Sequence, residues 1–132
     1  MRVGMIGVGT WLLAVAMTVG AHAQTTPRAT AAKMKNPVTS DAASIASGQQ
    51  LYAKQCRMCH GTTGKADTAA AKAMGASDLT DATWSRGSSD GELFVVIQEG
   101  AGPDYKMKGF KGRQSEQDTW HVVNYLRSLA GK

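Results

Sequence analysis

The sequence predicts a small all-α domain. Three segments carry apolar residues at helical spacings of three and four, and none alternates in the way a half-buried strand does. The 132-residue chain has room for one domain of ordinary size. Long glycine-rich connections separate the helices, and few large apolar side chains are left to form a core. Something other than protein side chains must therefore fill the centre of the domain.

The first predicted helix begins near Asp41 and runs directly into Cys56. Residues on one of its faces recur at spacings of three and four, as an α-helix requires. These residues are Ile45, Gly48, Leu51, Tyr52 and Gln55. We therefore expect ordered structure from Asp41 onward, with no break between this helix and Cys56.

Two later helices are predicted by capping signals and apolar stripes. Ser89 and Glu92, three positions apart, form a capping box at the start of the second helix, and Gly100 ends it. The apolar stripe of this helix is Leu93, Val96 and Ile97. The last helix opens at Ser115 and ends before Gly131. Its inner face is Val122, Tyr125, Leu126 and Leu129, flanked by Trp120 and Val123.

The N-terminus has the pattern of a secretory signal peptide. Arg2 supplies a positive start, residues 3–19 are nearly all apolar, and residues 21–23 (AHA) form a small-x-small cleavage site. We expect cleavage after Ala23 and export to the periplasm. The alternative is retention as a membrane anchor, although the segment is shorter than the roughly 20 residues needed to span. The expected organisation is a signal peptide over 1–23, a flexible leader without apolar period over 24–40 and one folded domain over 41–132.

The chain is basic, with a formal net charge of +5 at pH 7. Such a surface attracts acidic protein faces or anionic lipid. Nucleic acid is not an expected partner, because an export signal removes the chain from that compartment. The Lys residues are also scattered rather than gathered with aromatic residues on one segment. We expect membrane contact only if the apolar N-terminal segment is retained.

Residues 56–60 read CRMCH, which is the C-x-x-C-H attachment site for c-type haem. Two thiols three positions apart at a helix end can each bond to one of the two vinyl groups on one edge of the porphyrin. The imidazole of the next residue then lies beneath the iron as its proximal ligand. We therefore expect one haem c, attached covalently through Cys56 and Cys59 and coordinated by His60.

Three other interpretations of this motif each lack a further element that they would need elsewhere in the sequence. A redox disulfide of the thioredoxin type belongs in a βαβ setting, and no segment of this chain reads as a strand. A structural disulfide would have to join the two cysteines of this one motif, since the chain has no other cysteine. A closed zinc site needs four ligands, and beyond Cys56, Cys59 and His60 the mature chain offers only His121 far downstream.

Met107 is the expected sixth ligand of the iron, because a Met thioether suits an electron carrier and raises its potential. Met58 lies between the cysteines and cannot reach the opposite face of the ring, and Met34 lies in the expected leader. Met107 stands in a glycine-punctuated loop between two helices, from which it can swing over the distal face. Met74, in an Ala-rich stretch, is expected in the core or on the surface. His121, early in the last helix, is the alternative for a bis-His site.

Between about Asp41 and Gly131 the sequence resembles the class I cytochrome c family. The resemblance rests on CRMCHG at 56–61, SDGELF at 89–94, a Met followed by Gly-Phe at 107–110 and WHVVNYLRSL at 120–129. It implies a small cytochrome c fold, in which three to four helices wrap around one covalently attached haem. It also implies that Gly48 and Tyr52 on the first helix meet Tyr125 on the last.

Two departures from the family pattern concern the haem ligands. Many members carry a Pro directly after the ligand Met, where this chain has Lys108, so a Pro does not stiffen this loop. Many also carry a Pro beyond the haem His, whose carbonyl orients the imidazole, but residues 61–83 contain none. Some other backbone carbonyl in that stretch must therefore accept the proton on the second imidazole nitrogen.

The two haem propionates need hydrogen-bond donors if they are partly buried. The candidates are Trp84, Arg86 and Tyr105. Trp84 and Arg86 lie in a segment before the capped helix that resembles the loop running under the haem edge in related cytochromes. The simpler interpretation is that the aromatic residues belong to the core and the Arg to the surface.

These features predict an electron carrier rather than an enzyme. Iron would alternate between ferrous and ferric while His60 and Met107 stay bound, and no substrate would touch the metal. We expect redox proteins as donor and acceptor, a membrane oxidase or a dehydrogenase among them. Lysines close in sequence to the haem-binding segments would form a basic rim for an acidic partner. They are Lys65, Lys72, Lys106, Lys108 and Lys111.

Two other classes of function remain open. A haem enzyme or gas sensor needs an open sixth position, but a gas-binding four-helix c-type protein would carry C-x-x-C-H near its C-terminus. An electron-transfer subunit of a membrane or dehydrogenase complex shares its chemistry with a carrier. A ferric absorption band from Met sulfur bound to iron would indicate a carrier rather than a haem enzyme or sensor. Copurification with a larger complex from the native cell would distinguish a subunit from a free carrier.

Overall fold

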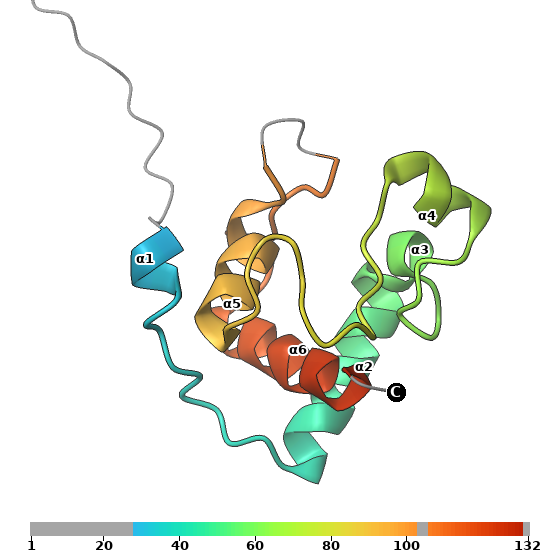
Figure 1. Cartoon of the computed structure of the whole chain (residues 1–132). Coiled ribbons are helices and arrows are strands. Elements are labelled where there is room, and N and C mark those ends of the chain that lie inside the picture. Colours follow the sequence, from blue (N-terminus) through green and yellow to red (C-terminus); the bar gives the residue numbers. More distant parts are fainter. Residues whose placement is uncertain (1–27, 103–105, 131–132) are drawn as a thin grey trace, which may run out of the picture.

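The structure, a computed structural model, describes residues 28–102 and 106–130. These ranges hold the helices α1 (Arg28–Ala31), α2 (Ala42–Gln55), α3 (Arg57–His60), α4 (Ala69–Met74), α5 (Asp90–Glu99) and α6 (Glu116–Leu129). Their only β pairing consists of isolated bridges that join Gly100 to Lys108 and Lys111 to Gln114. The prediction of an all-α fold is confirmed for this part of the chain (Figure 1). None of the described helices is both long and apolar enough to span a bilayer.

The three long helices begin where the sequence predicted, near Asp41, at Ser89 and at Ser115. Asp41 caps α2 by accepting a hydrogen bond from the backbone N–H of Ser44, and Ser115 caps α6 in the same way. Ser89 and Glu92 form the predicted capping box of α5. The Ser89 donors and the nearby Arg28 hold the pKa of the Glu92 carboxyl at about 2. The helices α1, α3 and α4 were not predicted, because each is too short to show a helical period.

Helices α2 and α6 cross at close range, as the resemblance implied. A Cβ added at Gly48 would collide with the backbone carbonyl of His121, so only glycine permits this approach. One turn further along α2, the Tyr52 ring lies 5.2 Å from the ring of Tyr125 at an interplanar angle of 57°. This tilted pair fills the gap beside the crossing.

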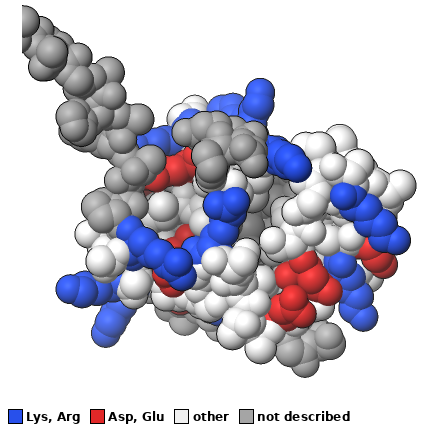
Figure 2. Space-filling model, turned by 45° about the horizontal axis from the view of Figure 1, so that its top comes forward, with Lys and Arg blue, Asp and Glu red and all other residues white. Residues whose placement is uncertain are grey.

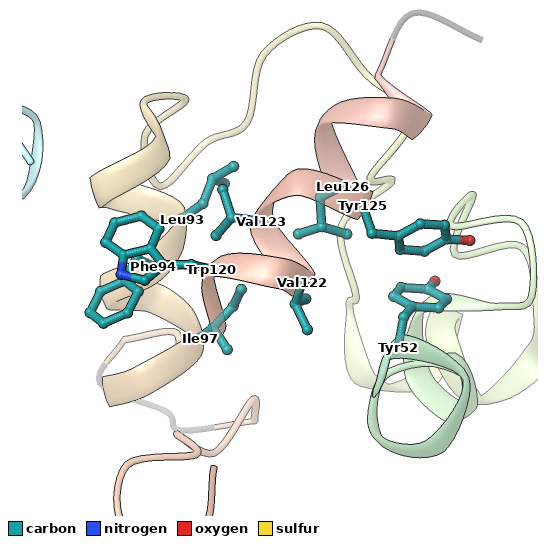
Figure 3. Packing of buried hydrophobic residues seen from close by; sticks show 9 residues of the cluster. All are labelled: Tyr52, Leu93, Phe94, Ile97, Trp120, Val122, Val123, Tyr125 and Leu126. Atoms are coloured by element: carbon teal, nitrogen blue, oxygen red, sulfur yellow. The ribbon is translucent and has the colours of Figure 1, made fainter. Parts of the chain in front are cut away.

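The apolar core lies mainly between α5 and α6 (Figure 3). Leu93, Phe94 and Ile97 of α5 form one apolar cluster with Tyr52 of α2 and five residues of α6, and Phe94 stacks on Trp120 at 4.1 Å between ring centroids. The α6 members are Trp120, Val122, Val123, Tyr125 and Leu126. Val96, predicted in the apolar stripe of α5, is only half-buried in the protein and lines a cavity instead.

The segment of residues 28–40 differs from the flexible leader expected there. Ala31 is buried against Gly91 of α5, where a Cβ would collide with the Ala31 carbonyl. Asn36 donates a 2.7 Å hydrogen bond to the side chain of Asn124, which in turn donates to the carbonyl of Val38. Apolar periodicity did not reveal this packing because small residues and amide groups make it.

Replacing Gly48 with Ala tests the helix crossing. We expect the free energy of unfolding to fall by about 3 kcal/mol, because the added methyl meets rigid backbone rather than a movable side chain. The matched control is Ala46→Val on the exposed side of α2, which should change stability by less than about 0.7 kcal/mol. Denaturant titration of the purified proteins measures both values, and equal losses would contradict the crossing.

Candidate cofactor site

Most of the predicted site residues line one cavity of about 490 Å³. Its volume lies within the roughly 300–1,000 Å³ that is usual for ligand and cofactor sites. The predicted residues that line it are Cys56, Cys59, His60, Trp84, Arg86 and Met107. Tyr105, the remaining predicted contact, lies outside the described residues. The structure thus brings together residues that are up to 51 positions apart in the sequence.

The C-x-x-C-H residues form a single tight helical turn. Cys56 ends α2 and also caps α3, and its carbonyl accepts hydrogen bonds from the N–H groups of Cys59 (3.1 Å) and His60 (2.9 Å). Both thiols are free and border the same cavity. Burial, followed by the nearby Cys59, raises the pKa of the Cys56 thiol to about 11. Cys56 is therefore a neutral thiol near pH 7.

His60 is oriented by a backbone carbonyl. Its Nδ1 lies 3.1 Å from the carbonyl oxygen of Ser77, which identifies the acceptor that the sequence left open within residues 61–83. Burial lowers the pKa of His60, although the bond to Ser77 opposes this effect. A neutral imidazole that donates Nδ1–H to Ser77 leaves the Nε2 lone pair free to bind a metal.

The turn after His60 brings Ser77 back under the imidazole. Tyr52 donates a 2.7 Å hydrogen bond from its hydroxyl to the carbonyl of Gly61, which holds the start of this turn against α2. The Leu79 N–H donates to the carbonyl of Gly64 at 2.7 Å and closes the turn. The acceptor for His60 is thus held by backbone contacts at both ends.

Met107 lies on a loop, residues 106–114, that is attached to the end of α5. The Ala101 N–H donates to the Met107 carbonyl at 3.0 Å, and the Phe110 N–H donates to the Ile97 carbonyl at 2.9 Å. The Lys111 N–H makes a third bond, to the Gln98 carbonyl at 3.0 Å. Tertiary hydrogen bonds therefore restrain the loop that lacks a Pro at position 108.

The structure also places the other residues that the sequence raised as possible ligands. Met74, expected in the core or on the surface, is 39% exposed at the end of α4 and also lines the cavity. His121 does not line it, because its Nδ1 lies 2.8 Å from the Ser44 hydroxyl at the crossing of α2 and α6. Met58 is 80% exposed and also lies outside the cavity lining. Met107 and Met74 are thus the thioethers that border the cavity.

Trp84 has an indole N–H group that is not hydrogen-bonded to any described residue. Its Nε1 is buried and finds no hydrogen-bond acceptor within the described part of the chain. The Arg127 guanidinium lies 5.4 Å from the centre of the indole and also donates to Asp90 at 2.7 Å. The backbone N–H of Trp84 donates a 2.8 Å hydrogen bond to the Ser88 hydroxyl, which fixes the backbone at this residue. A buried donor held in this way fits a ligand acceptor in the cavity.

The cavity lining is cationic. It includes Arg86, Lys106, Lys108 and Arg113, and no Asp or Glu belongs to it among the described residues. Arg113 was not predicted, since its position depends on its contact with the Phe110 ring at 4.9 Å and its 2.7 Å bond to the Gly109 carbonyl. Figure 2 shows several Lys and Arg side chains beside the hollow on this face. Such a lining suits a ligand that carries carboxylates.

The sequence matches one family model over residues 43–126, described as cytochrome c oxidase, cbb3-type, subunit III. This match covers more than half of the chain. The chain belongs to the class I cytochrome c family. Its cofactor is therefore haem c, as predicted, and its function class is electron transport.

Curated relatives of this cytochrome are subunits of cbb3-type oxidases. It is 34% identical over 96 residues to the CcoP subunit of Rhodobacter capsulatus, covering 69% of this chain and 31% of the relative. It is 33% identical over 87 residues to the FixP subunit of Bradyrhizobium diazoefficiens, covering 65% of this chain and 28% of the relative. The chain thus spans about a third of the length of these relatives.

Solved structures share the fold of this cytochrome. The KustC0563 c-type cytochrome has a TM-score of 0.55 and 30% identity, covering 63% of this chain and 96% of that one. Cytochrome cL from Methylophaga aminisulfidivorans has a TM-score of 0.56 at 22% identity, covering 67% of this chain and 56% of that one. A chain of the reducing HAO-like protein complex of Kuenenia stuttgartiensis has a TM-score of 0.64 at 20% identity, covering 74% and 49% respectively. These likenesses confirm the small cytochrome c fold.

The cavity of this cytochrome fits a haem group. Two thiols and an imidazole border it from one turn, a thioether borders it from the loop after α5, and apolar side chains such as Leu79, Leu93 and Val96 lie between them. The buried Trp84 Nε1 and the cationic lining suit the two carboxylates of a haem. Cys56, Cys59, His60 and Met107 would hold the group.

Replacing Trp84 with Phe tests the expected carboxylate contact. Without the indole donor, a propionate keeps more of its negative charge, which favours the ferric state. We expect the midpoint potential to fall by about 20–60 mV, since 59 mV corresponds to a factor of ten for one electron. The control Trp120→Phe removes an indole that packs on Phe94 outside the cavity, so it should lower stability without moving the potential. Spectroelectrochemical titration distinguishes the two, and equal potentials for W84F and the parent protein would refute the contact.

Proposed function

We propose that this cytochrome is a periplasmic one-electron carrier domain in which His60 and Met107 are the two axial ligands of a single haem. The observation that carries the proposal is that one cavity is lined by the C-x-x-C-H turn and by Met107. When bound, the haem supplies a ferrous–ferric couple, and a Met107 thioether on the iron would raise its reduction potential. The protein itself catalyses no reaction on a substrate.

The two ligand-bearing segments are held by separate backbone contacts. The carbonyl of Ser77 fixes the ring orientation and tautomer of His60. The carbonyls of Ile97 and Gln98 hold the loop that carries Met107. Ligands held in this way change position little between oxidation states, which keeps the reorganisation that accompanies electron transfer small.

The remaining lining sets the environment of the cofactor. Leu79, Leu93, Val96 and Phe110 supply an apolar surface that excludes water. Trp84 and Arg86 are the proposed donors to the propionates, and Tyr105 keeps that role as a prediction. Cys56 and Cys59 tether the ring, so the cofactor stays attached through every oxidation cycle.

The proposed location and partners extend what the relatives are named for. CcoP and FixP are named as cbb3-type oxidase subunits, which favours a membrane oxidase as one redox partner of this chain. Cleavage after Ala23 would release a free periplasmic carrier, and retention of residues 1–23 would keep the domain at the membrane. Copurification of an oxidase with the native protein would identify a subunit, and recovery from the soluble periplasm would identify a carrier.

Replacing Met107 with Ala tests the sixth ligand. We expect the ferric band from Met sulfur bound to iron to disappear and the midpoint potential to fall by about 0.1 V or more. The matched control is Met74→Ala, which removes the other thioether that lines the cavity and should keep the band. Absorption spectra of the ferric and ferrous proteins decide the outcome. A parent protein with high-spin iron that binds carbon monoxide avidly would instead indicate a haem enzyme or sensor.

The cationic lining predicts a charge preference in electron exchange. The double variant Lys106→Glu/Lys108→Glu should slow reduction by ferrocyanide several-fold and speed reduction by hexaammineruthenium(II), because electrostatic steering changes sign. The control Lys33→Glu/Lys35→Glu makes the same change in net charge at exposed positions outside the cavity lining. Stopped-flow rates at low ionic strength should separate the two variants and converge in high salt. Identical rates for both variants would contradict a basic docking edge.

A further inference from the structure

The loop that carries Met107 rests on a polar cluster made of the buried Gln98 and Thr119 and the half-buried Gln114, here named the Thr119 cluster. Thr119 is 0% exposed and Gln98 is 7% exposed. The Thr119 hydroxyl accepts hydrogen bonds from Gln98 Nε2 at 2.5 Å and from Gln114 Nε2 at 2.9 Å. None of the three side chains lines the cavity or carries a role in the proposed electron transfer.

The hydrogen-bonding capacity of the Thr119 hydroxyl is fully used. A hydroxyl has one donor and two acceptor sites, and this one donates to the Ser115 carbonyl at 3.0 Å while it accepts from both amides. The three partners come from α5, from the end of the 106–114 loop and from the start of α6. One buried hydroxyl is therefore hydrogen-bonded to three segments of the chain.

The Thr119 cluster reaches Met107 through the backbone. The Gln98 carbonyl accepts from the Lys111 N–H, and a Cβ added at Gly109 would collide with the same carbonyl. The Gln114 N–H donates to the Phe110 carbonyl at 3.0 Å. Both glutamines are therefore hydrogen-bonded through their backbones to residues three and four positions after Met107.

We propose that the Thr119 cluster is a positioning element that keeps the Met107 thioether in place against competing ligands, above all in the ferric state. A thioether is a soft ligand, and it suits ferrous iron better than the harder ferric iron. The rigidity of the loop then decides whether Met107 or an external base occupies the sixth site. This inference rests on the proposed His60 and Met107 ligation and adds Thr119, Gln98 and Gln114 as positioning residues.

The test is an imidazole titration of the ferric holoprotein. Thr119→Val keeps the shape of the side chain but leaves two amide donors without their acceptor. We expect imidazole to displace Met107 with an apparent dissociation constant about tenfold lower than in the parent protein. Thr119→Ser keeps the hydroxyl and should restore the parent value to within about twofold. The ferrous spectrum should stay unchanged in both variants.

A matched control separates positioning from simple loss of stability. Ser44 is also a buried hydroxyl, 4% exposed, that accepts from Asn124 at 2.8 Å and contacts His121, but it lies at the crossing of α2 and α6. Ser44→Ala should lower the denaturation midpoint without changing imidazole binding. If Thr119→Val proves too unstable to purify, Gln114→Leu removes one bond of the cluster and should give a shift of about threefold in the same direction.

Amide hydrogen exchange gives a readout that does not depend on the iron. In Thr119→Val the N–H groups of Phe110 and Lys111 should exchange about tenfold faster, while the Cys56 N–H, bonded to Tyr52, keeps its rate. Equal imidazole binding in Thr119→Val and the parent, or equal shifts in Thr119→Val and Ser44→Ala, would overturn the inference. An unchanged ferric band in Met107→Ala would instead show that the proposed ligation has failed, so the two failures are distinguishable.

Discussion

The cavity depends on one constraint, the close crossing of α2 and α6 at Gly48. The C-x-x-C-H turn continues from the end of α2, and the loop with Met107 is attached to the end of α5. Among the described helices, α6 packs against both α2 and α5, whereas α2 and α5 do not pack against each other. The two sides of the haem site are therefore placed relative to each other through α6. A side chain at position 48 would collide with the backbone of α6 and so push α2, with the C-x-x-C-H turn, away from the helix that also holds α5.

This arrangement explains why the two ligand-bearing segments have independent anchors. His60 is oriented by the Ser77 carbonyl within its own turn, and Met107 is restrained by contacts with α5 and by the Thr119 cluster. Among the described helices, α6 is the one that packs against both α2 and α5, so the two sides have no direct helix contact with each other. Under the proposed ligation, a change in how tightly Met107 is held would therefore leave the covalent attachment of the haem unaffected.

Side-chain signals allowed much of the molecule to be predicted from the sequence. The capping residues of α5 and α6 and the C-x-x-C-H motif each depend on residue type at a fixed spacing, and the resemblance to class I cytochromes c implied the tyrosine pair. The acceptor for His60 is a backbone carbonyl, which every residue has, so its identity emerged only with the fold. The same holds for the position of Arg113, which depends on a turn, and for residues 28–40, which pack through small residues and amides.

The missing Pro after Met107 shows how tertiary contacts replace a local restraint. A proline at a compatible position stabilises a fold by about 0.4–1 kcal/mol, chiefly by restricting the unfolded chain. The loop makes three backbone hydrogen bonds, two to α5 and one to Ala101 just after it. They contribute about 0.5–1.5 kcal/mol each, so together they exceed what the proline would add. These bonds form only because Gly100 and Gly109 have no Cβ, since a side chain at either position would meet backbone atoms of the facing segment. The stiffness of the Met107 loop is therefore encoded in two glycines and a buried threonine rather than in the residue that follows Met107.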